Sequence, residues 1–245
     1  MTKYPFSRLA KYAFVLAVIA ALAVMLAGLG TRLGLWNFRT GLTILKWGGY
    51  WAVATTVFSL IGVIMVKAGR SRLDLLGASL GLLISLIILG VLGQWYWTAR
   101  HVPPIHDITT DTENPPGFVA ILPLRKDSPN PAEYGGQVIA LQQRVGYPDL
   151  GPLILNIPPD QAFNKALLTA HEIGWEVYTS DQSQGRIEAT DTTFWFGFKD
   201  DIVVRVSSAD GGSRIDVRSV SRVGRSDVGT NARRIEIYLK KIKAE

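Results

Sequence analysis

The first hundred residues contain three long runs of apolar side chains, and none has a charged residue in its interior, since Asp74 lies at the very start of the third. The runs cover about residues 12–30, 47–66 and 73–97. A helix of about 20 apolar residues crosses ~30 Å of hydrocarbon, and each run is close to that length or exceeds it. The pattern therefore predicts a membrane domain of three helices in residues 1–100.

The first apolar run also has features of a secretory signal peptide, because Lys3, Arg8 and Lys11 precede it. It is longer than an ordinary signal-peptide core, and no convincing small-x-small cleavage site follows it. We therefore expect this run to remain in the protein as a membrane span.

Residues 101–157 form a Pro-rich connecting arm. Seven of the twelve prolines of the chain lie between positions 103 and 131. Proline fixes φ and lacks a backbone donor, so this part should be extended or rich in turns. It is either a spacer that holds a domain off the bilayer or an arm that wraps around the domain. Apolar side chains between positions 118 and 157 favour the wrapping arm, because they need burial.

The pattern of residues 158–245 predicts a helix, an antiparallel sheet and a second helix. An apolar stripe with Asp160 as N-cap predicts a helix to about Ile173. A period of two then predicts strands at 175–180, 186–190, 193–198, 202–208 and 214–220. Their connections are too short for parallel crossovers. With a final amphipathic helix after Asp227, we expect an α+β domain with a two-layer sandwich architecture.

One predicted strand, 193–198, carries a cluster of aromatic residues. In a strand, Phe194, Phe196 and Phe198 would face one way and Trp195 the other. We interpret the first three as sheet core beneath the helices, with a hydrophobic ligand cavity as the alternative.

The charge of the chain is unevenly distributed. Residues 1–100 contain ten Lys and Arg against one acidic residue, whereas 101–245 contain sixteen against nineteen. Basic residues that flank apolar segments indicate a membrane protein, so we expect no nucleic-acid partner. The absence of Cys excludes disulfides, thiolate nucleophiles and Cys-ligated metal centres.

The basic residues also predict the orientation of the membrane domain. The N-terminus and the second connection together carry six Lys and Arg, and the opposite side carries four. Positively charged flanks resist translocation. We therefore expect the N-terminus inside and the C-terminal domain outside.

Four segments of the C-terminal region form a recognisable set. They are PPIHDITTDTENPP (103–116), GWEV (174–177), IEATDTTFWFGFKDD (187–201) and DVRSVSRVGRSDVGTNARRI (216–235). Together they resemble the domain of unknown function 1499 family over essentially all of 101–245. The resemblance implies a bacterial or plastid-type domain that often follows membrane spans and has no established activity. We expect a multi-pass protein of the bacterial cytoplasmic (inner) membrane with a periplasmic domain.

The last of these segments holds the candidate ligand-binding residues Arg218, Arg222, Asp227 and Asn231. The arginines lie on and after the last strand, and Asp227 lies where the final helix begins. A helix start offers unpaired N–H groups and a partial positive charge, so the site is suited to an anion. In the alternative interpretation, Asp227 only caps the helix, and the arginines pair with acids of the domain. Those acids are Asp200, Asp201 and Asp216.

The sequence offers few candidate catalytic residues. The chain has no phosphate loop, dinucleotide fingerprint, nucleophile elbow or zinc motif, so we assign no catalytic residue, cofactor or metal. Our main hypothesis is a membrane-anchored binding or scaffold module. Its expected partners are membrane lipid, an anionic or amphipathic small molecule, or a membrane protein. The alternative is a hydrolase or transferase of cell-envelope material that uses Asp200, Asp201 or Asp227 as acid or base.

Overall fold

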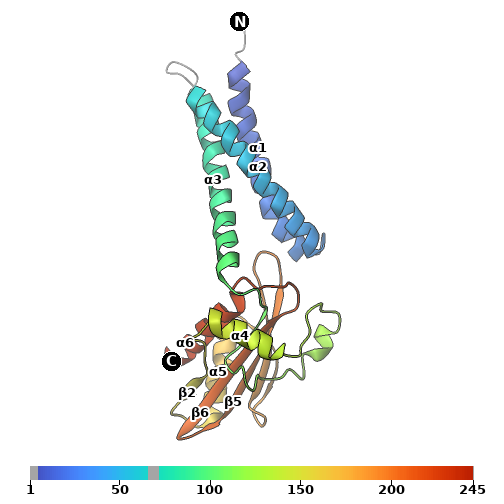
Figure 1. Cartoon of the computed structure of the whole chain (residues 1–245), viewed down its shortest axis with the longest axis vertical. Coiled ribbons are helices and arrows are strands. Elements are labelled where there is room, and N and C mark those ends of the chain that lie inside the picture. The colour runs from blue at the N-terminus through green and yellow to red at the C-terminus, as the bar shows by residue number, and fades with distance from the viewer. Residues whose placement is uncertain (1–4, 66–71, 245) are drawn as a thin grey trace. The chain divides into compact units, whose positions relative to one another are not determined.

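The computed structural model describes residues 5–65 and 72–244, which contain six α-helices and one antiparallel sheet of six strands (Figure 1). The chain divides into two compact units. The first comprises Met1–Trp97 together with Phe194–Gly197, and the second comprises Thr98–Thr193 and Phe198–Glu245. Each unit is described by itself.

The first unit contains the three apolar helices α1 (Pro5–Arg32), α2 (Phe38–Met65) and α3 (Arg72–His101). Each is long and apolar enough to cross a membrane, as the sequence predicts. The helices extend beyond the apolar runs into polar and aromatic flanks. Four residues used in the predictions of spans and orientation lie outside the described residues: Lys3, Val66, Lys67 and Arg70.

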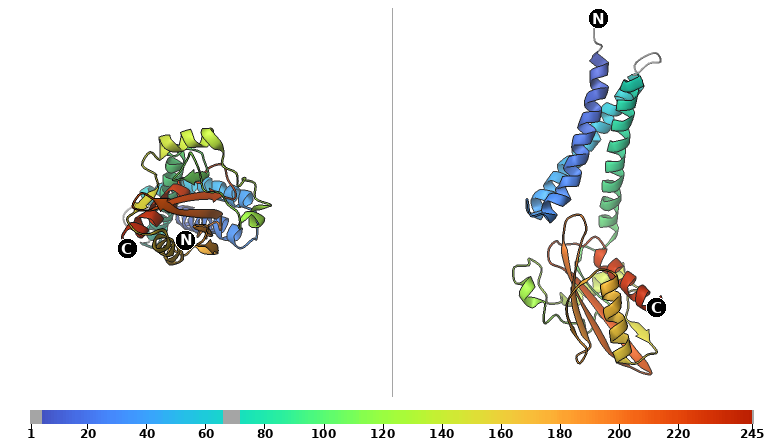
Figure 2. Two further views of the ribbon diagram at one scale, coloured as in Figure 1. Left: turned by 90° about the horizontal axis from the view of Figure 1, so that it is seen from below. Right: turned by 180° about the vertical axis from the view of Figure 1, so that it is seen from behind.

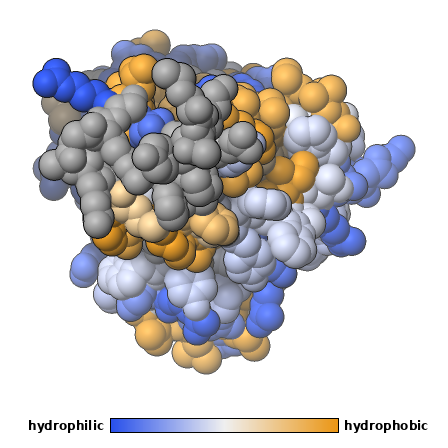
Figure 3. All heavy atoms as spheres, turned by 90° about the horizontal axis from the view of Figure 1, so that it is seen from above, coloured by the Kyte–Doolittle hydropathy of each residue, from blue (hydrophilic) through white to orange (hydrophobic). Residues whose placement is uncertain are grey.

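Small residues allow the three helices to approach one another. A Cβ on Gly48 of α2 would lie 2.7 Å from Val24 Cγ2 of α1, and one on Gly81 of α3 would lie 2.8 Å from Ser59 Oγ of α2. Ala17 and Ala52 are fully buried. Large apolar side chains face outward instead, and orange side chains reach the surface in the space-filling view of Figure 3. This distribution suits helices whose surroundings are hydrocarbon.

The predicted strand 193–198 is wrong. The segment is a tight turn in which the Thr193 N–H donates to Phe198 O and the Phe198 N–H donates to Thr193 Oγ1, both at 2.8 Å. Gly197 takes a φ of +68°, which breaks the strand. The aromatic residues at the tip belong to the first unit, where Trp195 Nε1 donates to Met25 O at 2.9 Å. Phe194 is 83% exposed, so the predicted sheet-core position is also wrong for that residue.

The second unit is built on the antiparallel sheet. Its strands are β1 (Asp107–Thr109), β2 (Leu153–Leu155), β3 (Glu176–Asp181), β4 (Arg186–Thr192), β5 (Lys199–Ala209) and β6 (Gly212–Ser221). The order is β1-β6-β5-β4-β3, with β2 also paired to β6. Strands β3 to β6 form the predicted meander. Strands β1 and β2 come from the Pro-rich arm and lie along different parts of β6.

Helices α5 (Pro159–Glu172) and α6 (Thr230–Ala244) cover one face of the sheet, as expected for the α+β fold (Figure 2). The main core lies between them and the sheet. Within it, the rings of Trp175 and Tyr238 stack at 4.5 Å, and the Tyr238 hydroxyl donates to Ala166 O. Pro158 rather than Asp160 is the N-cap of α5, because Pro159 occupies the first helical position, where proline fits.

The Pro-rich arm lies against the domain and contains a helix that the sequence pattern did not predict. This helix, α4 (Gly136–Gly146), places Gln143 beside the edge strand β1, where its amide contacts both the N–H and the carbonyl of Thr109. A short 3-10 helix, Leu122–Arg125, precedes it. On the second face of the sheet, Phe118 and Ile121 of the arm pack on Val203 and Val220.

Candidate functional site

The two faces of the sheet differ in chemistry. On β6, Ile215 and Val217 point into the apolar core, while the alternate residues Arg214, Asp216 and Arg218 form a charged face under the Pro-rich arm. Neighbouring strands add further charged residues to the same face. They are Arg186, Glu188, Asp201 and Arg205, and Arg222 follows just after β6. A buried charged face requires partners for each group, because burying an unpaired charge is costly.

Arg218 is at the centre of this face and is 2% exposed. Its Nε and Nη2 donate to the two carboxylate oxygens of Asp107 at 2.9 and 2.8 Å. Its remaining contacts are to the carbonyls of Pro116 at 3.2 Å and Ala132 at 2.8 Å. The guanidinium carbon lies 5.2 Å from the ring centroid of Phe118. Arg218 is thus held by one carboxylate and two main-chain carbonyls, with the aromatic rings of Phe118 and Tyr134 beside it.

Asp201 is fully buried and is shared by two arginines. Arg222 donates to both of its oxygens at 2.9 and 2.8 Å, and Arg125 Nη1 donates to Oδ2 at 2.5 Å. Thr190 Oγ1 donates to the same carboxylate at 2.7 Å. Burial raises the pKa of Asp201, but the hydrogen bonds and charge of these partners outweigh it, so the pKa is lowered. Asp201 is therefore held in its ionised form.

The charges in this part of the face do not balance. Three guanidinium groups, those of Arg125, Arg218 and Arg222, share the carboxylates of Asp107 and Asp201. Two buried polar atoms nearby, Arg125 Nε and the Tyr134 hydroxyl, have no hydrogen-bond partner within the described part of the chain. The Tyr134 ring centroid lies 5.4 Å from the Arg218 guanidinium carbon. Burial, reinforced by Asp107, raises the pKa of Tyr134 to about 12, so its hydroxyl remains a donor.

Asp227 and Asn231 lie at the start of α6, on the other face of the sheet. Asp227 accepts from the backbone N–H groups of Gly229 and Asn231, both at 2.8 Å, and so caps the helix. Asn231 is fully buried: Ser219 Oγ donates to its Oδ1, and its Nδ2 donates to His106 O and Ser221 Oγ. Both side chains organise the junction between α6 and the sheet.

The four predicted site residues therefore fall into two pairs. Arg218 and Arg222 lie on the charged face under the arm, and Asp227 and Asn231 lie at the α6 junction. Side chains on opposite faces of one sheet do not converge on a single ligand group. Each of the four has partners within the chain. Arg222 pairs with Asp201, as in the alternative interpretation, whereas Arg218 pairs with Asp107, which that interpretation did not name.

The family assignment follows from the second unit. A family model described as "Protein of unknown function (DUF1499)" matches residues 107–242, more than half of the chain. The chain belongs to the DUF1499 family. Neither the curated proteins nor the solved structures gave a match to the chain.

The DUF1499 match begins at Asp107, the carboxylate partner of Arg218, and includes every residue of the charged face. The three apolar helices lie outside it. Sequence reasoning identified two arginines of this face but missed Asp107, Arg125 and Tyr134. The alternating charges at 214, 216 and 218 on a predicted strand were a visible signal for the face itself. The contributions of the arm were not visible, because they lie far from β6 in the sequence.

The acidic residues of the catalytic alternative differ in their surroundings within the DUF1499 domain. Asp200 pairs with Arg234 at 2.7 Å and is 3% exposed, and Asp201 is held ionised. Asp227 differs, because burial raises its pKa, aided by the charge of Asp200 and opposed by its two backbone hydrogen bonds. Beside it, Val228 has a φ of +53°, which is rare for a β-branched residue. The residues that the structure describes include no cluster of three acidic or His side chains able to hold a metal.

Proposed function

We propose that this DUF1499 protein is a membrane-anchored binding module whose C-terminal domain recognises an anionic or amphipathic ligand near the bilayer. We further propose that it lies in a bacterial cytoplasmic membrane with the domain in the periplasm. The ligand site would be the charged face under the Pro-rich arm, and Arg218 and Arg222 would be two of its residues. Asp227 and Asn231 would then hold α6 against the sheet and act on the ligand only indirectly.

One observation carries the proposal: beneath the arm, the guanidinium groups of Arg125, Arg218 and Arg222 share two carboxylates, and two buried polar atoms have no hydrogen-bond partner within the described residues. The spare donor capacity of Arg125 and Arg218 goes to neutral main-chain carbonyls of the arm. These are Pro116, Asn130, Pro131 and Ala132, at 2.8–3.3 Å. A charged acceptor forms shorter and stronger hydrogen bonds with guanidinium than a neutral carbonyl does. An anion that reached this layer would therefore compete well with the arm.

The proposal is tested with inorganic phosphate as the probe on the full-length protein in mild detergent. We expect phosphate to raise the thermal midpoint of the domain by about 5 °C over chloride at equal ionic strength, once phosphate is ~100-fold above its Kd. Tyr134→Phe should leave the midpoint without phosphate unchanged or higher, because it removes a buried hydroxyl that has no partner in the described part of the chain. The same variant should lose most of the phosphate gain.

Tyr147→Phe is the matched control. The Tyr147 hydroxyl is also buried and has no hydrogen-bond partner among the residues that the structure describes, and burial, with Asp227 and Glu236, raises its pKa to about 12. It is close to the α6 junction, since a Cβ on Gly229 would lie 3.4 Å from the hydroxyl. This variant should keep the phosphate gain. The proposal is wrong if the wild type gains nothing specific from phosphate, or if both variants respond like the wild type.

A second candidate function is a hydrolase or transferase that acts on cell-envelope material, with Asp227 as the acid or base. It is supported by the raised pKa of Asp227 and the strained backbone at Val228. If a hydrolytic activity on isolated cell-envelope material is detected, Asp227→Asn should reduce kcat at least about 100-fold. Asp200→Asn should then change it little. Equal activity in wild type and Asp227→Asn would remove this candidate.

A further inference from the structure

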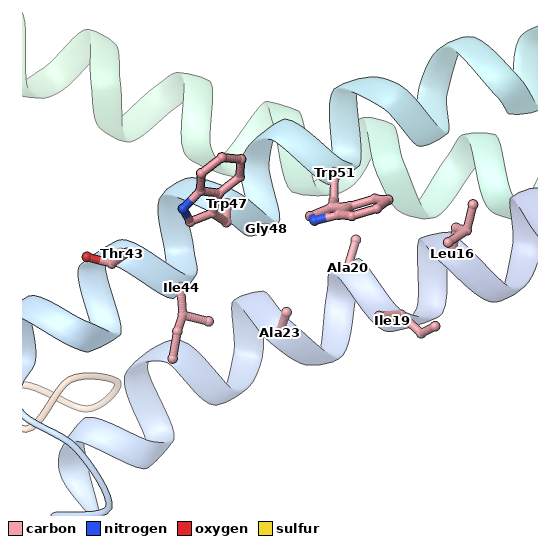
Figure 4. Close-up of a pocket in the computed structure, with 9 residues that line it drawn as sticks. All are labelled: Leu16, Ile19, Ala20, Ala23, Thr43, Ile44, Trp47, Gly48 and Trp51. Atoms are coloured by element: carbon pink, nitrogen blue, oxygen red, sulfur yellow. The ribbon is translucent and has the colours of Figure 1, made fainter.

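The apolar helix pair of the first unit encloses a groove between α1 and α2. The groove has a volume of about 450 Å³, within the range of small-molecule sites. Its lining comes from both helices, as Figure 4 shows. The small residues Ala20, Ala23 and Gly48 leave room there between larger side chains, which are Leu16, Ile19, Ile44, Trp47 and Trp51.

The lining of the groove is almost entirely hydrocarbon and aromatic. Thr43 supplies the one hydroxyl among the lining residues, and that hydroxyl already donates to Arg39 O at 2.9 Å. The indoles of Trp47 and Trp51 are 58% and 54% exposed and supply the remaining polar edges. Trp is enriched where a helix passes from hydrocarbon to the headgroup layer. The groove is therefore suited to an alkyl chain at this level of the helices, and a polar solute would find few partners in it.

Two cations on α2 lie on the same helix face as Thr43, a lining residue of the groove. Arg39, Thr43 and Lys46 are spaced by four and three residues, so they lie on one face of the helix. Arg39 and Lys46 are exposed, and neither forms an ion pair within the described residues. The Lys46 ammonium lies 5.9 Å from the ring centroid of Tyr50, which keeps it on the side of the helix that bears the interface aromatics. An apolar groove with two cations on the helix face of its lining residue Thr43 matches a ligand with a hydrocarbon chain and an anionic head.

We propose that this groove binds an anionic phospholipid, with an acyl chain between α1 and α2 and the phosphate against Arg39 and Lys46. Three observations select this occupant over another helix or a soluble ligand. The helices are of membrane-spanning length and apolarity. The lining offers few groups to a polar ligand. The two cations complement a phosphate and would oppose the positively charged flank of a second copy of α2.

The experiment is native mass spectrometry of the full-length protein in mild detergent. The probes are dioleoyl phosphatidylglycerol and dioleoyl phosphatidylcholine, supplied separately at equal concentration. We expect phosphatidylglycerol to be retained at least about tenfold more strongly, because each cation near the surface favours an anionic lipid by a factor of ~5. Arg39→Gln with Lys46→Gln should make the two lipids equal. Ala23→Leu, which fills the groove, should reduce retention of both.

Two control variants make the result specific to the groove. Lys11→Gln with Arg72→Gln also removes two cations. Lys11 lies in the N-terminal part of α1 and Arg72 begins α3, so this variant should keep the preference for phosphatidylglycerol. Gly90→Leu adds the side chain that Ala23→Leu adds, but at a position where a Cβ would meet no atom within 4 Å. It should leave retention unchanged. Equal retention of the two lipids by the wild type, or equal losses in test and control variants, would overturn the proposal.

Discussion

At the scale of single residues, the DUF1499 domain uses buried ion pairs and carboxylates to attach its arm to the sheet. Glu188 on β4 is fully buried and accepts from the backbone N–H groups of three consecutive arm residues, Val119, Ala120 and Ile121. Asp111 of the arm bridges Arg205 and Arg214, each at 3.1 Å. The arm is thus held on the charged face mainly by ion pairs and hydrogen bonds, whereas α5 and α6 are held on the opposite face by apolar packing.

The acid sensitivity of the domain should come from this face. Burial raises the pKa of Asp216, but its bonds to Arg214 and Arg205 outweigh that effect and the pKa is lowered, as it is for Asp201. Because the pKa of each carboxyl is lower in the folded domain than the unfolded value of ~3.9, each ionised carboxylate stabilises the fold above about pH 3.9. This stabilisation is lost as the pH falls through the folded value. The pKa of Asp227 is raised, so this residue has the opposite effect on stability: its contribution is present at low pH and is lost as the pH rises.

We therefore expect Asp216→Asn to lower the free energy of unfolding by about 2 kcal/mol at pH 7, because it weakens charge-assisted bonds to two arginines. The difference from wild type should shrink as the pH is lowered from 4 to 2. Denaturant unfolding followed by circular dichroism at several pH values measures both quantities. Asp210→Asn, in the exposed β5–β6 turn, is the control and should show no such trend. A pH-independent difference would mean that packing, and not charge, carries the effect.

At the scale of elements, the arm adds two short strands to β6, and one glycine makes the second pairing possible. A Cβ on Gly212 would lie 2.0 Å from the carbonyl oxygen of Leu155, closer than real Cβ contacts come. Gly212 begins β6, and its neighbour Ser213 pairs with Leu155 of β2. The close approach of β2 therefore requires glycine at this position.

We expect Gly212→Ala to destabilise the domain by about 2–3 kcal/mol, because β2 must move away from β6. Hydrogen exchange should accelerate at the amides of Leu153 and Leu155. Gly211→Ala is the control: its φ of +79° brings a strain of about 1–2 kcal/mol, but a Cβ there meets no atom within 4 Å. It should leave β2 protected. Equal acceleration in both variants would show that the hairpin turn, and not the β2 contact, is at fault.

The sequence predicted the elements whose side chains repeat regularly. The stripes of α5 and α6 and the alternation in β3 to β6 reflect packing against the core, whereas the three apolar runs reflect helices that are apolar on their outward sides as well. The segment 193–198 also alternates, but Gly197 and the side chain of Thr193 close a turn that alternation does not reveal. Helix α4 was missed because its outward residues Val138, Leu141 and Val145 are apolar and exposed, which blurs the amphipathic pattern.

The candidate site was less predictable than the fold. Arg218 and Arg222 could be singled out because cations on a strand before a helix start suggest an anion site. Arg218 lies on one face of the sheet, while Asp227 and Asn231 lie against the other. The face that each β6 residue occupies depends on how β6 pairs with β5, and the sequence alone does not give that register. The partners Asp107, Arg125 and Tyr134 come from arm positions about 85 to 110 residues before Arg218. No local pattern links such distant positions.

At the scale of the whole molecule, the chain combines three helices long and apolar enough to cross a membrane with a C-terminal part that holds 35 of the 46 Lys, Arg, Asp and Glu residues. Three crossings would place the α1–α2 connection and the C-terminal domain on one side and the α2–α3 connection on the other. The excess of basic residues, six against four, predicts that the domain side is outside. One experiment on the intact chain can measure both the number of crossings and the side on which the C-terminal domain lies.

The chain contains no Cys, so single cysteines can report its topology without background. We choose Leu33→Cys and Leu73→Cys, at side chains 72% and 76% exposed, and Gln184→Cys in the exposed β3–β4 turn. In spheroplasts of a bacterial host, a membrane-impermeant maleimide should label positions 33 and 184. Position 73 should react only after permeabilisation. The reverse pattern would show that the six-to-four count misassigns the sides. Different labelling at 33 and 184 would instead show that α2 and α3 do not both cross, because two crossings must return the chain to the side from which it started.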